Sequence, residues 1–162
     1  MPEHLDEGGP EPLEHEQRAH DLQCPAFVPA CRHPERIEAA AVPATPRALL
    51  RAVLAELLPL DEERRTRALV HAAYFVRSLN DERLAALFRD APPALEELAA
   101  ALIVQARDDG GVAPGVDPRR EADLLLATVD GLQTSMLLGH HDVEEALALV
   151  DYQLGRIFAD GG

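Results

Sequence analysis

Two histidines and two cysteines near the start of the chain are residue types that bind zinc. His20, Cys24, Cys31 and His33 follow one another in the pattern H-x3-C-x6-C-x-H. Structural zinc sites usually pair cysteines about two to four residues apart, and this pattern does not. Two prolines also lie between the four side chains. We therefore expect no zinc site in this segment.

A second group of possible metal ligands is the run His140, His141 and Asp142. Side chains that follow one another on a turn point in different directions. No third ligand is spaced to join the two histidines. The run is therefore predicted to be a solvated turn, and we expect the protein to use no metal and no cofactor.

Residues that could perform catalysis are not arranged to do so. The sequence lacks a glycine-rich phosphate loop, a nucleophile elbow and a metalloprotease motif. Ser78 and Ser135 have no base that their spacing can pair with them, and the adjacent carboxylates of Glu96-Glu97 and Glu144-Glu145 are predicted to face water. We therefore expect a protein that is not an enzyme.

The net charge of −14 disfavours two classes of partner. Non-specific binding to nucleic acid requires an excess of basic residues, and anionic membrane surfaces attract basic proteins. The longest apolar run, residues 98–104, is too short to cross a bilayer. The first residues lack the basic and apolar regions of a secretory signal. A cytoplasmic location is the expectation.

The composition favours an all-α fold. Ala and Leu supply 52 of the 162 residues, and aromatic residues make up 4%. These residues form helices readily and are poor strand formers. Apolar residues recur at helical spacing, and Asp, Thr and Pro mark helix starts. About six to seven helices are predicted, starting at Pro34, Pro46, Asp61, Asp81, Leu95, Asp117 and Asp142 and ending near Ala41, Leu58, Leu79, Pro92, Asp109, Leu138 and Phe158.

Five features, in this order, carry a resemblance to a known family: residues 57–65 (LLPLDEERR), a long Leu/Ala helix after Asn80-Asp81-Glu82, Gly110-Gly111-Val112, Asp117-Pro118, and residues 127–132 (ATVDGL). Residues 45–158 thereby resemble the ligand-binding and dimerisation domain of TetR-family transcriptional regulators, most closely the BetI-like branch. The resemblance implies a helical bundle over residues 45–162. It also implies a small-molecule effector, a homodimer and control of transcriptional repression.

Residues 1–44 depart from that family, which carries a helix-turn-helix head at this end of the chain. The segment is rich in proline, and nine acidic residues stand against Arg18, Arg32 and Arg36. Apart from the short helix from Pro34, it is predicted to be irregular and to make no DNA contact, so DNA would be bound only if a head were supplied. The head was lost by truncation or a shifted reading frame, or the chain is a natural headless paralogue. Such a paralogue would act by heterodimerisation or by sequestering ligand.

The resemblance implies a ligand site between the middle helices, with an apolar lining and a few convergent polar groups. Its polar candidates are His71, Tyr74 and Gln105. The full set of predicted ligand-binding residues is Leu50, Leu54, Val70, His71, Tyr74, Phe75, Leu87, Phe88, Leu102 and Gln105. The carboxylates of Glu56, Asp61 and Asp130 make a cationic or amphipathic ligand conceivable, although acidic residues at helix starts act first as caps.

The last two helices are the predicted dimer seam, as the resemblance implies. The helix from Asp117 has two apolar stripes, and one of them must face the protomer's own body. We assign the seam to Leu125, Val129, Leu132, Met136, Leu147, Val150, Leu154 and Phe158. A second stripe carries Leu124, Ala127, Gly131 and Leu138. The sequence does not decide which stripe faces outward, nor whether all of these residues form intramolecular core.

Overall fold

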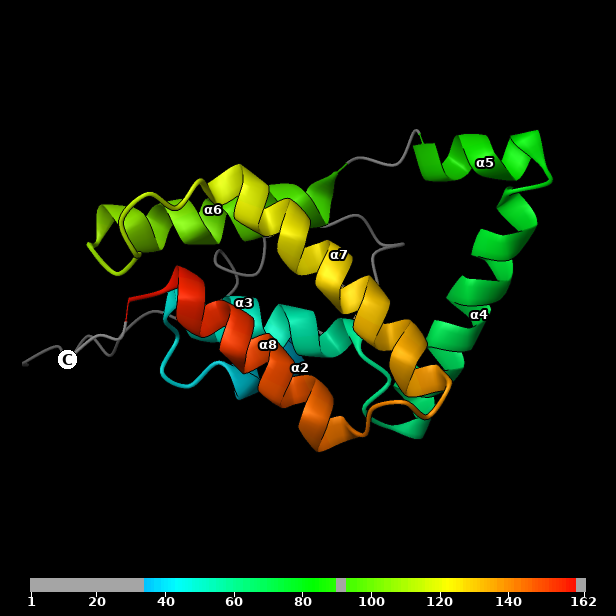
Figure 1. Cartoon of the computed structure of the whole chain (residues 1–162), viewed down its shortest axis with the longest axis horizontal. Coiled ribbons are helices and arrows are strands. Elements are labelled where there is room, and N and C mark those ends of the chain that lie inside the picture. The colour runs from blue at the N-terminus through cyan, green and yellow to red at the C-terminus, as the bar shows by residue number, and fades with distance from the viewer. Residues whose placement is uncertain (1–33, 90–92, 160–162) are drawn as a thin grey trace, which may run out of the picture.

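The computed structural model describes residues 34–89 and 93–159, and this part of the chain is an all-α fold (Figure 1). Its seven helices confirm the fold class expected from the sequence. They are α2 (Pro34–Ala40), α3 (Pro46–Leu57), α4 (Glu62–Ser78), α5 (Glu82–Arg89), α6 (Ala94–Asp108), α7 (Pro118–Leu137) and α8 (Val143–Ile157). None of these helices is both long and apolar enough to span a membrane. His20, Cys24, Cys31 and His33, where no zinc site is expected, lie outside the described residues.

Side-chain caps start the helices where the sequence predicts. The Thr45 hydroxyl accepts a hydrogen bond from the first turn of α3, and the Asp61 carboxylate does the same for α4. Asp117 caps α7 in this way, and Asp142 forms a reciprocal capping box with Glu145 at the start of α8. Each cap satisfies backbone N–H groups that have no partner within the helix, and each typically contributes about 1 kcal/mol.

The main hydrophobic core lies between α3, α6, α7 and α8. Leu50, Leu54 and Leu58 enter it from α3 and its C-terminal end, and Ile103 and Leu154 enter it from α6 and α8. A smaller cluster places Ile37 and the adjoining Ala41 against the other side of α3. The short helix predicted from Pro34 therefore forms and packs against the body of the fold.

Polar contacts hold α8 in place at two points. The Arg51 guanidinium of α3 donates two hydrogen bonds to the Asp151 carboxylate of α8, at 2.5 and 2.9 Å. This contact raises the pKa of Arg51 and keeps it charged. The loop after α6 pairs with the end of α8 through the Ala113 N–H to Ile157 carbonyl bond at 2.9 Å. These contacts fix α8 against both α3 and the α6–α7 loop.

Helices α4 and α5 stand to one side of the other helices (Figure 1). Helix α4 packs on α3 and α7, and α5 packs on α4. Pro93 directly precedes α6, at the position where the sequence predicts that a helix is interrupted or kinked. From Leu69 onward, α4 and its C-cap leave several large apolar side chains exposed to solvent: Leu69, Val70, Tyr74, Phe75, Val76 and Leu79.

The residues assigned to the dimer seam are buried or partly buried within the protomer. On α7, Leu125, Val129, Leu132 and Met136 are buried by their own chain. The residues assigned to the seam on α8 and just after it, Val150, Leu154 and Phe158, are buried as well, and Leu147 is partly buried against the same core. The second stripe of α7 faces solvent, with Leu124 54% and Leu138 66% exposed.

The core position of Leu54 gives a stability prediction. Leu54→Ala should lower the free energy of unfolding by roughly 2–5 kcal/mol, because its fully buried side chain would leave a cavity. The exposed Leu79→Ala is the control and should change it by less than about 0.5 kcal/mol. Urea unfolding followed by circular dichroism measures both, and equal effects would contradict this packing.

Candidate functional site

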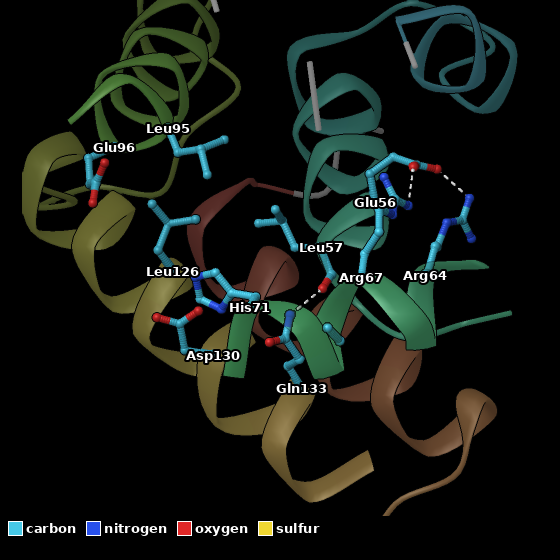
Figure 2. A pocket seen from close by; sticks show the side chains of 11 residues that line it. Glu56, Leu57, Arg64, Arg67, His71, Leu95, Glu96, Leu126, Asp130 and Gln133 are labelled. Atoms are coloured by element: carbon cyan, nitrogen blue, oxygen red, sulfur yellow. Dashed lines mark hydrogen bonds and ion pairs between the residues drawn. The ribbon is translucent and has the colours of Figure 1, made fainter. Parts of the chain in front are cut away.

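A cavity of about 150 Å³ lies where α3, α4, α6 and α7 meet (Figure 2). Its lining is apolar in the middle and charged at both sides. The lining residues are Glu56, Leu57, Arg64, Arg67, Ala68, His71, Leu95, Glu96, Leu126, Asp130 and Gln133. An apolar pocket with a small number of converging polar groups is the usual form of a small-molecule site.

One side of the cavity is built on the buried carboxylate of Glu56. This α3 side chain is only 4% exposed, and it accepts a hydrogen bond from the Arg64 guanidinium. Arg67 approaches the second carboxylate oxygen at 3.5 Å. Arg64 and Arg67 lie three residues apart on α4, so both reach α3 from one helix face. We call Glu56, Arg64 and Arg67 the Glu56 cluster; it compensates a charge that would otherwise be costly to bury.

Gln133 fixes α7 against the end of α3. Its side-chain Nε2 donates a hydrogen bond of 2.8 Å to the Leu57 carbonyl (Figure 2). The last carbonyls of a helix have no donor within that helix, and Leu57 is the last residue of α3. The contact therefore gives the Leu57 carbonyl a hydrogen-bond donor. It also holds α7 close to the end of α3, and these two helices form two walls of the cavity.

The other side of the cavity is acidic. Glu96 of α6 and Asp130 of α7 line it, and the His71 side chain of α4 lies beside Asp130 (Figure 2). Desolvation by the surrounding protein raises the pKa of Asp130 above its usual value; nearby His71 opposes this rise and Glu96 adds to it. We call Glu96 and Asp130 the acidic wall.

This arrangement is suited to binding. Charged and amide groups converge on the apolar side chains of Leu57, Leu95 and Leu126. Among the described residues, no three His, Cys, Asp or Glu side chains are grouped to hold a metal ion.

Comparison with known proteins assigns the fold to a family. Residues 46–159 match the family described as BetI-type transcriptional repressor, C-terminal. The chain belongs to the BetI-type repressors of the TetR family. Its fold is also similar to the crystal structure of a transcriptional regulator from Rhodococcus sp. Rha1, with a TM-score of 0.62 and 28% sequence identity, over 89% of this chain and 72% of that one. No curated protein gave a match.

This BetI-type chain brings one predicted ligand residue, His71, to the cavity. Leu50, Leu54 and Leu102 lie in the main core instead. The remaining predicted residues lie elsewhere. Val70, Tyr74 and Phe75 are exposed on α4, Gln105 is exposed on α6, and Leu87 and Phe88 belong to α5, with side chains outside the described part of the structure.

The sequence pointed to Glu56 and Asp130 as carboxylates near a ligand, but it did not point to the cavity residues Arg64, Arg67 and Glu96. Glu56 carried a usable signal, because it falls four residues after Ala52 and three after Val53, on an otherwise apolar face of α3. Asp130 carried another, because it lies in the interior of α7, where a carboxylate cannot cap the helix start.

Because Glu56 is buried with two arginines, replacing its carboxylate by a neutral side chain should strongly destabilise this BetI-type chain. Glu56→Gln should lower the free energy of unfolding by roughly 2–4 kcal/mol, because two guanidinium groups lose their carboxylate. Glu82→Gln removes the exposed ion pair with Arg89 and should cost at most about 1 kcal/mol. Urea unfolding of both variants is the measurement, and a tolerated Glu56→Gln would show that the buried pair does not hold α4 to α3.

Because the pKa of Asp130 is raised, replacing Asp130 by a neutral side chain should stabilise the fold, and the gain should depend on pH. A carboxyl whose pKa is higher in the folded than in the unfolded chain makes the fold less stable as pH rises through that interval. Asp130→Asn should therefore raise the melting temperature at pH 7 by up to about 2 °C, with the gain shrinking toward about pH 4. Thermal unfolding across this range tests it, with Asp109→Asn on the exposed end of α6 as the control. A loss of stability at pH 7 would contradict the assignment.

Proposed function

We propose that this chain is the effector-binding and dimerisation part of a ligand-responsive transcriptional repressor. The observation that supports it best is the cavity between α3, α4, α6 and α7, in a chain that matches a repressor family over the same helices. A small molecule bound there would touch α4 on one side and the core helices on the other. Its differential affinity for two arrangements of α4 would shift their populations.

Helix α4 is also connected to the N-terminal side of the fold. Arg36 of α2 donates a hydrogen bond of 2.7 Å to the Glu63 carboxylate in the first turn of α4. This contact raises the pKa of Arg36. The family carries its DNA-binding head on the N-terminal side of this domain. A change in α4 caused by ligand would therefore reach α2, and through it whichever head precedes the domain.

The surface that supports dimerisation is the outer face of α7, formed by Leu124, Ala127, Gly131 and Leu138. All four residues are exposed in the protomer. Glycine and alanine in the middle of this face allow a second helix to approach closely. A two-fold axis across the face would make it self-complementary.

Helix α8 extends this surface. Leu149 and Tyr152 are exposed on it, one turn apart, while Val150 and Leu154 enter the core. The proposed dimer thus keeps the last two helices as its seam but uses the faces opposite to the residues assigned from the sequence. Two helices from each protomer would bury these apolar side chains together.

Substitution of Gly131 tests the dimer. A Cβ built at Gly131 meets nothing within 4 Å in the protomer, so Gly131→Arg should fold and even gain helix stability. In the dimer it would place two arginines near the axis and raise the dimer Kd on the order of a hundredfold. Ala73→Arg, on an exposed face of α4, is the control.

Light scattering after size exclusion provides the measurement. At micromolar concentration, the wild type and Ala73→Arg should have the molar mass of a dimer. Gly131→Arg should have the molar mass of a monomer. A monomeric wild type would contradict the proposed assembly. An intact Gly131→Arg dimer would contradict this choice of face.

A further inference from the structure

His71 lies where the second half of α4 meets α7. After Ala68, Ser78 is the buried residue of α4, and its hydroxyl donates a hydrogen bond of 2.7 Å to the Phe75 carbonyl of the same helix. His71 lines the cavity, and its imidazole lies beside the Asp130 carboxylate of α7 (Figure 2). The C-terminal end of α4 leads away from α7 toward α5 (Figure 1). The contact between these two side chains is therefore placed to control how closely α4 follows α7.

The acidic wall lacks an arginine partner in the described part of the chain. Both arginines that line the cavity, Arg64 and Arg67, are engaged by Glu56. Glu96 and Asp130 form no ion pair with an arginine within residues 34–89 and 93–159. A positive charge placed between α4 and these two carboxylates would therefore be stabilised.

Two further sets of charged groups lie on the helices packed around α4, and each set is paired internally. The Glu56 cluster lies across the cavity from His71 (Figure 2). Helix α5, which also packs on α4, carries Glu82 paired with Arg89. Of the two groups whose charge changes the pKa of Asp130, one is a carboxylate, and the imidazole is the one that can become positive.

An imidazole can supply the missing charge because it ordinarily gains a proton near pH 6.5. Desolvation raises the pKa of Asp130, which shows that its carboxylate has lost part of its hydration. A protonated imidazole beside such a carboxylate donates a charge-assisted hydrogen bond. Guanidinium groups and most carboxylates keep their charge between pH 6 and pH 8, so the imidazole is the group that changes.

We propose that protonation of His71 docks the second half of α4 on α7. The charged imidazole pairs with Asp130, and the negative charge of Glu96 adds to the attraction. The neutral imidazole leaves both carboxylates without a cation, and α4 is then held mainly at its first half. Helix α4 is also the helix that an effector is proposed to move, so acidification would bias it toward the docked arrangement. The pH response itself requires no effector and does not rest on the proposed function.

Replacement of the imidazole by a neutral side chain tests the contact. His71→Gln should lower the melting temperature by about 2 °C at pH 6 and by less than about 0.5 °C at pH 8, because the stabilising pair exists only while the imidazole is charged. His140→Gln is the matched control, since His140 is exposed on the turn after α7 and does not line the cavity. Both substitutions remove one titrating imidazole, so they change the net charge equally.

A permanent cation separates the effect of charge from that of packing. His71→Arg is charged at both pH values, so it should raise the melting temperature by about 2 °C at pH 8 and leave it unchanged at pH 6. Ala73→Arg adds the same side chain at an exposed position of α4 and should show no such difference between the two pH values. A role of His71 in packing alone would not be rescued by arginine.

Combined substitutions identify the partner of the imidazole. In an Asp130→Asn background, the effect of His71→Gln at pH 6 should fall by at least about half, because the two side chains then no longer form an ion pair. Asp123→Asn is the control background, since Asp123 is an exposed carboxylate of α7 that does not line the cavity. In that background the effect of His71→Gln should be retained.

Hydrogen exchange locates the part of the fold that responds. The amides of residues 72–78 should open about threefold less often at pH 6 than at pH 8, once the exchange rates are corrected for their intrinsic dependence on pH. The amides of α6 and α7 serve as the internal reference. In His71→Gln the difference between the two pH values should be lost.

Four results would each overturn the proposal. They are an equal pH dependence of His71→Gln and His140→Gln, a His71→Arg that behaves like His71→Gln, an undiminished effect of His71→Gln in the Asp130→Asn background, and exchange at residues 72–78 that does not depend on pH. None of these measurements contains a ligand, so their failure leaves the proposed function in place. A monomeric wild type, in turn, would contradict the proposed assembly without affecting this contact.

Discussion

The buried carboxylate of Glu56 determines where α4 stands, and α4 is one complete wall of the cavity. Burying a carboxylate without a partner is too costly for a fold of ordinary stability, so Glu56 requires Arg64 and Arg67 beside it. Those two guanidinium groups bring the first half of α4 against α3. The second half leaves most of its apolar residues in solvent. The cavity forms at the boundary between these two halves.

Helix boundaries could be predicted because they depend on local chemistry. Asp61, Asp117 and Asp142 each satisfy N–H groups within the next turn, and no distant residue is needed for that. The orientation of α7 could not be predicted in the same way. Leu125 and Leu124 are adjacent and equally apolar, and only the packing of α3, α6 and α8 decides that Leu125 enters the core.

The cavity was harder to predict for a related reason. Apolar side chains such as Leu50 and Leu102 were expected to line a ligand site, but an apolar residue serves a core as well as it serves a pocket. The residues that mark the cavity are charged ones, such as Glu56 and Asp130, placed within helices where no cap is needed. Whether such a charged residue lines a cavity depends on which helices pack around it. The periodicity of a single helix carries no information about that packing.

Helix α7 contributes to the core, the cavity and the proposed dimer surface at once. Val129 enters the core, Asp130 lines the cavity and Gly131 faces outward, in three successive residues. A helix held on so many sides is costly to displace, because any shift disturbs close packing in the core. Helix α4 is held mainly at its first half and carries few buried side chains, so its rearrangement costs less free energy. A ligand that contacts both helices would therefore move α4 against a fixed α7. In the proposed dimer the seam would then stay constant while the contact between Arg36 and Glu63 carries the change toward the N-terminal side.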